Sequence, residues 1–160
     1  MEKVDENIYY PKAAGKEISF MLYNYENIDK LIDNRKITLM DSIDVRNSAW
    51  LKSRKADGYT LEDVISRFDD DNNIKRLKTW KKVINSFISK LYDNPNKIYY
   101  LFIKYKFLEK LDNVIIAERL NLEEKDIKSF EVNIKWLLYC YAINTELFVE
   151  EGYVKCQNVK

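Results

Sequence analysis

The sequence predicts an all-α protein, and three observations support that prediction. Glycine and proline are scarce, with 3 and 2 in 160 residues, so few tight turns and hairpins are expected. Apolar residues make up 46% of the chain and charged residues 33%, a composition that folds around a core. Long segments also carry apolar residues at intervals of three and four, the spacing of one helix face. The length suits one domain, or a small domain with an attached helical region.

The N-terminal region, residues 1–58, is expected to hold one amphipathic helix and a flexible loop. A polar lead-in ends at Pro11, and a helix is predicted over roughly residues 16–35. Between residues 36 and 58 the periodicity is lost, and Asp57-Gly58 marks a turn, so this interval is predicted to be a loop. The apolar stripe of the predicted helix consists of Ile18, Met21, Leu22, Tyr25, Ile28, Leu31 and Ile32.

Two helices are expected in the central region, residues 59–94. Thr60 is a plausible N-cap for the first, which should end near Phe68. The run "DDDNN" at 69–73 should break that helix and cap the next one. Asn94-Pro95 should end the second helix, because the residue before proline avoids helical geometry. The apolar stripe of this second helix consists of Ile74, Leu77, Trp80, Ile84, Phe87, Ile88 and Leu91.

The region 95–149 is expected to contain three helices, followed by a polar tail at 150–160. The first is predicted from "NKIYYLFIKYKFLEKL". "DNVIIAERL" and "EEKDIKSFEVNIKWLLYCYAI" follow, joined by about three residues. One face of the first helix should carry Ile98, Leu101, Phe102, Tyr105 and Leu108.

The stretch "NVIIAERLNLEEKDIKSF", residues 113–130, has the spacing of a helix-turn-helix. Ala117 is small, as the crossing point of two helices requires, and Asn121 tolerates left-handed backbone in the bend. Two ordinary core helices joined by a tight turn show the same pattern, so both interpretations stay open. The apolar residues that would lock the pair together are Ile116, Leu120, Leu122, Ile127 and Phe130.

The surrounding segment resembles the promoter-reading C-terminal domain of bacterial sigma factors and its relatives. "FIKYKFLEKL", "IIAERLNL", "DIKSF" and "IKWLLY" follow one another in the order found there. The resemblance implies a sigma-like helix-turn-helix at the C-terminal end of an otherwise helical chain. Two positions depart from the pattern. Glu123 stands where relatives commonly have a Ser or Thr cap, and Phe130 replaces a small or polar residue.

A second resemblance covers about residues 18–145. "MLYNYENIDKLI", the lysine-rich "IKRLKTWKKVINSFISKLY" and the final motif, in that order, resemble phage regulators of late genes of the ArpU/RinA type. This resemblance implies a phage-encoded, DNA-binding transcription regulator with double-stranded DNA as its partner. We expect it to act as a homodimer or together with host RNA polymerase.

If the motif reads DNA, its second helix should enter the major groove. The base-facing candidates on that helix are Glu124, Lys125, Lys128, Ser129 and Asn133. The candidates for contacts to the phosphate backbone are Asn113, Arg119 and Lys135. Residues 97–135 carry eight basic and seven acidic side chains, so a single copy should bind DNA weakly.

A second basic element, "KRLKTWKK", could supplement the motif. Its cations are Lys75, Arg76, Lys78, Lys81 and Lys82. They could follow a phosphate backbone, with Trp80 among them. They are equally expected on the solvated side of a helix whose Leu77, Trp80 and Ile84 face the core.

The composition argues against several other functional classes. The net charge is only +1, so no global field drives the chain onto polyanions. There is no His and there are only two Cys, which excludes a four-ligand Cys/His zinc site. Asp69, Asp70 and Asp71 are better explained as helix caps than as metal ligands. We expect no metal, no cofactor and no catalytic residues, because no Gly-rich phosphate loop or activated nucleophile is present.

The expected location is cytoplasmic and nucleoid-associated, with no membrane contact. No apolar run approaches the roughly 20 residues that a membrane span needs, and the start "MEKVDENIYYPK" lacks a secretory pattern.

Two rival functions remain. The first is a protein-binding module, directed at RNA polymerase or a defence-system target, that keeps the sigma-like fold without reading DNA. Four acids, Glu123, Glu124, Asp126 and Glu131, favour it because they are unusual around a lone reading helix. The second is a phage small terminase subunit, which assembles as a ring.

Overall fold

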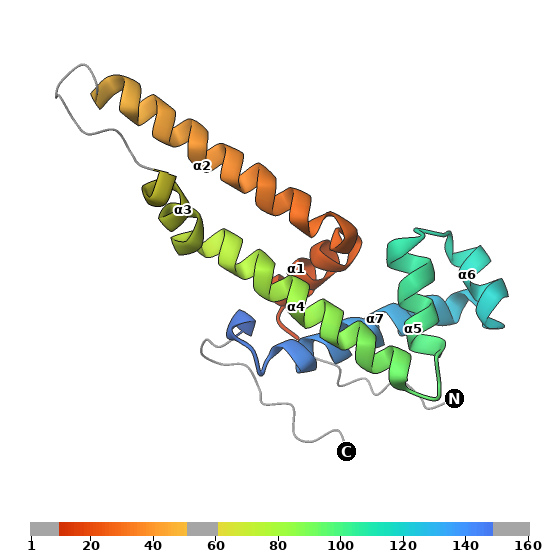
Figure 1. Ribbon diagram of the computed structural model, residues 1–160. Helices are drawn as coiled ribbons and strands as arrows, with labels where there is room; N and C mark the ends of the chain where they lie inside the picture. The colour runs from red at the N-terminus through yellow and green to blue at the C-terminus, as the bar shows by residue number, and fades with distance from the viewer. Residues whose placement is uncertain (1–9, 51–60, 149–160) are drawn as a thin grey trace. The chain divides into compact units, whose positions relative to one another are not determined.

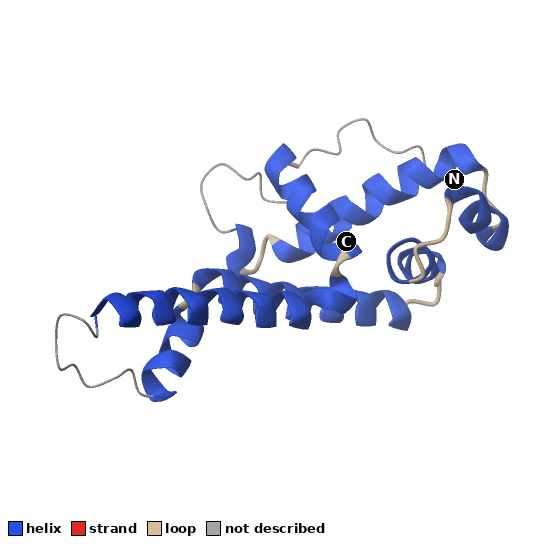
Figure 2. Cartoon of the chain, turned by 90° about the horizontal axis from the view of Figure 1, so that it is seen from above, coloured by secondary structure: helices blue, strands red, loops and turns tan. Residues whose placement is uncertain are grey.

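The computed structural model describes residues 10–50 and 61–148, and all regular secondary structure in these ranges is helical (Figures 1 and 2). This confirms the all-α class for the described part of the chain. No helix there is both long and apolar enough to cross a membrane. The seven α-helices of the described ranges are α1 (Lys12–Tyr23), α2 (Ile28–Trp50), α3 (Leu61–Asp70), α4 (Asn72–Asp93), α5 (Ile98–Ile103), α6 (Asn113–Leu120) and α7 (Glu124–Ala142).

The chain divides into two compact units. One combines residues 1–26 with residues 80–160, and the other comprises residues 27–79. The boundary falls inside α4, so its first turns belong to the smaller unit and the remainder to the larger one. The region 95–149, which includes the stretch of residues 113–130, lies wholly in the larger unit.

The single helix expected at residues 16–35 is wrong, because the chain forms two helices there. α1 ends at Tyr23, and the backbone and side-chain amides of Asn24 both donate to the Phe20 carbonyl, at 3.0 and 2.8 Å. A 3₁₀ turn follows before α2 begins at Ile28. Since an asparagine side chain that bonds the preceding turn competes with helix continuation, the helix ends at this residue. The apolar spacing continues across the break and conceals it in the sequence.

The loop expected at residues 36–58 is also wrong in its first part, because α2 continues as a helix to Trp50. Residues 51–58 lie outside the described ranges. Ile37 and Met40 on α2 remain exposed. Apolar periodicity reports burial, and a helix that is largely solvated carries no continuous apolar stripe. Over residues 36–42, most of which are exposed, α2 therefore carries no amphipathic spacing that a sequence search could find.

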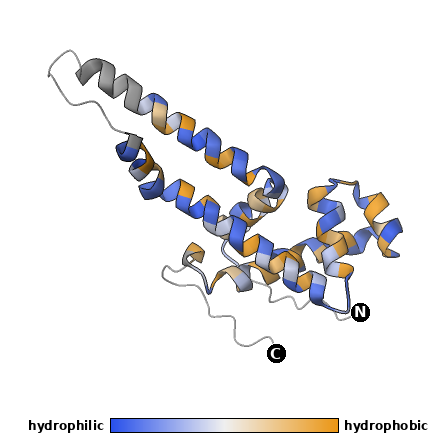
Figure 3. Cartoon of the chain, in the orientation of Figure 1, coloured by the Kyte–Doolittle hydropathy of each residue, from blue (hydrophilic) through white to orange (hydrophobic). Residues whose placement is uncertain are grey.

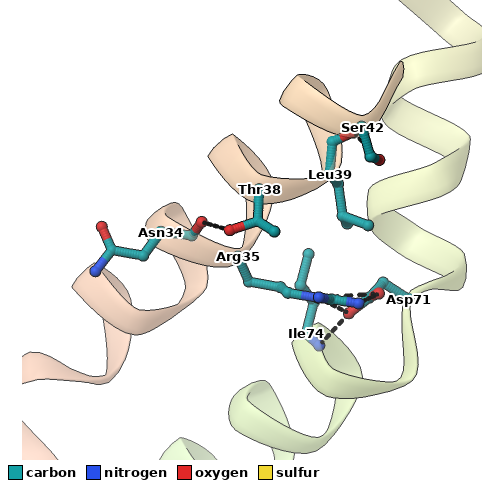
Figure 4. Close-up of polar contacts among 7 residues, drawn as sticks. All are labelled: Asn34, Arg35, Thr38, Leu39, Ser42, Asp71 and Ile74. Carbon is teal, nitrogen blue, oxygen red and sulfur yellow. Dashed lines mark hydrogen bonds and ion pairs between the residues drawn. The ribbon is translucent and has the colours of Figure 1, made fainter. Parts of the chain in front are cut away.

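Asp71 connects α2 to the start of α4 in the smaller unit (Figure 4). Its carboxylate receives two hydrogen bonds from the Nε of Arg35 on α2, both at 3.3 Å, and one from the Nη2 at 2.8 Å. The same carboxylate accepts a hydrogen bond from the backbone N–H of Ile74 at 3.0 Å, which makes Asp71 the N-cap of α4. The "DDDNN" run therefore caps α4 as predicted, whereas α3 continues to Asp70, two residues beyond its expected end near Phe68. The other predicted cap, Thr60, lies outside the described residues.

A core of aliphatic and aromatic side chains holds the larger unit together. Trp80 on α4 is 1% exposed, and its Nε1 donates to the Glu17 carboxylate of α1 at 2.8 Å. As predicted, α4 ends at Asp93, immediately before Asn94-Pro95. Hydrophobic residues recur along α5, α6 and α7, as Figure 3 shows. The buried side chains of α5 to α7 and the turn after α5 include Phe102, Ile103, Phe107, Ile116, Ile127, Ile134 and Leu138.

The apolar face predicted for residues 98–108 is only partly correct. Phe102 is buried as predicted, but Ile103 and Phe107 are also buried, whereas Leu101 and Tyr105 are half-exposed. α5 passes at Lys104 into a π-helical turn that runs to Leu108. A π-turn contains more residues than an α-turn, so it rotates the side chains that follow it relative to a regular helix. The turn therefore accounts for the burial of Phe107 in place of Tyr105, while Ile103 and Leu101 precede it and keep the register of α5.

We predict that the stability contributed by the Arg35–Asp71 pair depends on pH. The hydrogen bonds from Arg35 hold the pKa of Asp71 below its ordinary value. The contribution should be complete above the unfolded-state pKa of about 3.9 and should disappear as pH falls through the lower folded-state pKa. Asp71→Asn keeps a capping oxygen and removes the charge. In urea unfolding followed by circular dichroism, it should be less stable than the parent at pH 7.

At a pH below the folded-state pKa of Asp71, the parent and Asp71→Asn should unfold at the same urea concentration. A difference of equal size at both pH values would show that the charge of Asp71 does not stabilise this unit. Asp71→Ala provides the comparison for the cap, because it also removes the acceptor for the Ile74 amide and should cost about 1 kcal/mol more than Asp71→Asn.

Candidate nucleic-acid interface

The bend between α6 and α7 has the geometry that the sequence predicts. Asn121 adopts left-handed backbone angles, with φ 53° and ψ 48°. The N–H of Leu122 donates to the Ala117 carbonyl at 2.8 Å, and the N–H of Asn121 donates to the Glu118 carbonyl at 3.2 Å. This pair of bonds is the Schellman arrangement, which closes a helix and reverses the chain within a few residues.

Close packing joins α6 to α7 beside this bend. Ala117 is 5% exposed, and Ile116 and Ile127 are fully buried. Of the other predicted locking residues, Leu120, Leu122 and Phe130 are half-buried. The two helices therefore share a small apolar core of the kind that a helix-turn-helix requires.

The packing of Phe130 explains why this position departs from the sigma-factor pattern. Its ring stacks on Phe102 at a centroid distance of 5.7 Å and lies 5.5 Å from the ring of Tyr99. Both partners belong to α5, so the aromatic side chain packs α7 against a third helix. The large residue at this position contributes to packing and does not point to a base-contacting role.

Glu123 is the other position that departs from the sigma-factor pattern, and its ion pair gives it a different role from a cap. It occupies the N-cap position of α7 in extended geometry, yet its side chain makes no capping hydrogen bond. The carboxylate instead pairs with the Nζ of Lys125. This hydrogen bond holds the pKa of Lys125 above its ordinary value. Glu123 is thus a counter-ion to one of the predicted DNA-contacting lysines.

The base-facing candidates divide by their exposure. Glu124, Lys125 and Lys128 are exposed on the first two turns of α7, whereas Ser129 and Asn133 are half-buried. Val132, which the sequence argument did not select, is 39% exposed and follows Lys128 by four residues on the same side of the helix. Its signal in the sequence was this spacing. We refer to Glu124, Lys125, Lys128 and Val132 as the exposed α7 face.

The three residues predicted to contact the DNA phosphate backbone already have partners within the protein. Arg119 pairs with Glu109 at 3.3 Å and lies 5.1 Å from the centre of the Tyr105 ring. The side-chain oxygen of Asn113 accepts a hydrogen bond from Lys106 at 2.7 Å. Lys135 pairs with Glu131 at 2.7 Å, and the Lys135 side chain is only 16% exposed. A phosphate would have to displace or share these contacts.

Lys128 differs from the other cations of α6 and α7 in its ion pairing. Among the cations of α6 and α7, it alone makes no ion pair within the described residues, whereas Arg119, Lys125 and Lys135 each have a carboxylate partner. The positive potential of the motif is thus reduced by intramolecular pairing as well as by its near-neutral composition.

The second basic element is split between the two units. Lys75, Arg76 and Lys78 belong to the smaller unit, and Lys81 and Lys82 belong to the larger one. Lys75, Lys78 and Lys82 are exposed, while Arg76 and Lys81 are half-buried. Of the three residues predicted to face the core, Trp80 and Ile84 are buried and Leu77 is half-buried, so this segment is a helix with a core-facing side.

Within residues 10–50 and 61–148, no three His, Cys, Asp or Glu side chains gather closely enough to hold a metal ion.

We predict that the left-handed conformation of Asn121 limits which residues the bend accepts. Asn121→Gly should retain the stability of the parent, because glycine adopts this conformation without steric cost. Asn121→Val should lose about 1–2 kcal/mol, because its branched Cβ clashes in left-handed geometry. Thermal unfolding of the two variants measures the difference. Equal melting temperatures for glycine and valine would contradict the left-handed assignment.

The chain matches no protein-family model, no curated protein and no solved structure.

Proposed function

We propose that the protein is a sequence-specific, double-stranded DNA-binding transcription regulator whose α7 enters the major groove. The observation that carries this proposal is the left-handed bend at Asn121, closed onto the Ala117 carbonyl at 2.8 Å. This bend leaves the first turns of α7 exposed beside a compact two-helix core. The resemblance to sigma-factor promoter-reading domains and to phage late-gene regulators supports the same proposal.

The exposed α7 face has suitable chemistry for reading base edges. Lys125 and Lys128 can donate to guanine O6 and N7 or to phosphates. Glu124 can accept from a cytosine amino group, and Val132 can contact a thymine methyl group. The face combines donors, an acceptor and an apolar contact within two to three helical turns, so it can discriminate between base pairs as well as bind phosphates.

Charge compensation argues for two copies, or for a second protein, at the operator. Pairing of Lys125 with Glu123 and of Arg119 with Glu109 leaves a single motif with little net positive potential. Neutralisation of phosphates supplies most non-specific affinity, so one motif should bind weakly. A homodimer would present two motifs to adjacent half-sites. Contact with host RNA polymerase would have a similar effect by tethering the motif near promoter DNA.

We predict that Lys125→Ala/Lys128→Ala binds DNA at least about tenfold more weakly than the parent and lowers the salt slope by up to about 2. The probe is a duplex enriched from a randomised library, and the readout is fluorescence anisotropy over a series of salt concentrations. Lys12→Ala/Lys16→Ala is the matched control, since both lysines are exposed on α1 and the change in charge is the same. Unchanged affinity in the Lys125/Lys128 variant would show that α7 is not the reading helix.

We also predict that Glu123→Gln strengthens DNA binding. The substitution releases Lys125 from its counter-ion and removes one negative charge beside the exposed α7 face. Glu118→Gln removes one charge from an exposed residue of α6 that has no ion pair within the described ranges, so it isolates the effect of net charge. The affinity gain in the anisotropy assay should be larger for Glu123→Gln. Equal gains would mean that the Glu123–Lys125 pair does not compete with DNA.

A protein-binding module is the second candidate function, and one observation favours it. Val114 and Ile115, at the start of α6, are 60% and 39% exposed, so apolar surface lies on the motif itself. Library selection with no enriched sequence, together with a stoichiometric protein partner captured from host lysate, would favour this function over DNA reading. The mass of the protein in solution distinguishes the proposed dimer from the ring of a small terminase subunit.

A further inference from the structure

A surface hollow in the larger unit lies away from the exposed α7 face. It has a volume of about 530 Å³ and is formed by the second half of α4 together with the end of α7 and the turn after it. Its position is about 20 Å along α7 from Lys128, at the usual rise of 1.5 Å per residue. We call this feature the α4 hollow. Its lining residues are Lys82, Val83, Ser86, Lys90, Tyr141, Asn144 and Thr145.

Helical spacing brings the polar residues of α4 together in the hollow. Lys82, Ser86 and Lys90 follow one another at intervals of four, so they lie along one side of α4. Val83 is 6% exposed and belongs to the core beneath. The hollow therefore has a cationic rim above an apolar base.

Tyr141 holds this arrangement in place. Its hydroxyl shares a hydrogen bond with Ser86 at 2.6 Å, and its ring lies 5.8 Å from the ring of Phe87. The Nζ of Lys90 lies 4.7 Å from the centre of the Tyr141 ring, so a cation–π contact positions the ammonium group. An aromatic ring accepts no conventional hydrogen bond, and the N–H groups of Lys90 stay available to a ligand.

The hollow is rich in donors. In the Ser86–Tyr141 pair one hydroxyl donates to the other, and the accepting hydroxyl keeps its own proton for a further partner. The Asn144 side chain is exposed and adds an amide donor. Thr145 is already engaged, because its hydroxyl donates to the Ala142 carbonyl and accepts from the Leu147 N–H.

Its cations are also uncompensated. Within the described residues, neither Lys82 nor Lys90 makes an ion pair, and none of the residues described as lining the hollow is a carboxylate. The motif differs in this respect, because Arg119, Lys125 and Lys135 all have carboxylate partners. Two unpaired ammonium groups at one hollow favour an oxyanion there.

We propose that the α4 hollow binds a phosphate group through Lys82, Lys90 and the Ser86–Tyr141 hydroxyl pair. The phosphate comes either from a small phosphorylated molecule or from a nucleic-acid backbone, and the chemistry of recognition is the same for both. Phosphate presents several acceptor oxygens, which match the three kinds of donor in the hollow. The inference does not depend on the proposed reading of DNA by α7.

The test is a titration of the full chain with inorganic phosphate at constant ionic strength, followed by amide chemical shifts in NMR. Saturable shifts are expected for residues 82–90 and 141–145. Lys82→Gln/Lys90→Gln should weaken this binding at least about tenfold, because it removes both charge-assisted donors. Tyr141→Phe keeps the ring and loses the hydroxyl, so it should weaken binding by a smaller factor. Lys12→Gln/Lys16→Gln is the matched control and should bind phosphate as the parent does.

A second titration, with duplex DNA of random sequence, identifies the source of the phosphate. If the hollow takes backbone phosphate, the Lys82/Lys90 variant should lower the salt slope of DNA binding by up to about 2, while the control variant leaves it unchanged. If it takes a small phosphorylated molecule, the variant should lose phosphate binding and retain its affinity for the duplex.

The proposal is overturned if the phosphate shifts rise linearly without saturation, or if they are the same in the parent and the Lys82/Lys90 variant. Failure of the proposed DNA-reading function looks different. In that case the Lys125→Ala/Lys128→Ala variant would bind selected duplexes as the parent does, whatever the result at the hollow.

Discussion

The direction of α7 depends on one left-handed residue, Asn121. Its conformation lets the Leu122 N–H reach the Ala117 carbonyl at 2.8 Å, and this bond ends α6 and turns the chain. The small Ala117 then allows close approach, so that Ile116 and Ile127 are buried together beside the bend. Packing of Phe130 against α5 secures the same helix at a second point. The exposed α7 face is a consequence of these contacts.

Electrostatic pairing sets the strength of the proposed interface. Three of the four cations on α6 and α7 have carboxylate partners within the described residues, and each partner lies within ten residues in sequence. The exposed pairs of Arg119 and Lys125 contribute little to stability, whereas the Lys135–Glu131 pair is half-buried. All three pairs lower the positive electrostatic potential that attracts phosphates. We therefore expect weak non-specific binding to DNA. Specific binding should then depend on base contacts or on a second copy of the chain. The α4 hollow has the opposite character, with cations that lack carboxylate partners.

The sequence was informative where burial or backbone geometry constrains a residue. Asn121, the Asp71 cap and the end of α4 before Pro95 were all predicted, because each position has few chemical solutions. Apolar spacing failed where it continued across a break at Asn24, and over residues 36–42 of α2, most of which are exposed. The π-turn that begins at Lys104 changed the register of the residues after it, so that Phe107 is buried and Tyr105 is not. Residue spacing alone did not reveal how side chains are placed in three dimensions. It therefore could not predict the partners of Arg119 and Lys135 or the α4 hollow.

The most direct test of the account is to map the amide chemical shifts of the full chain as a library-selected duplex is added. If α7 reads DNA, the largest changes should fall on residues 124–133, with smaller changes near Asn113 at the start of α6. Changes confined to other parts of the chain would contradict the account. A selection that enriches no sequence, followed by no shift in α7 on adding any duplex, would contradict it equally.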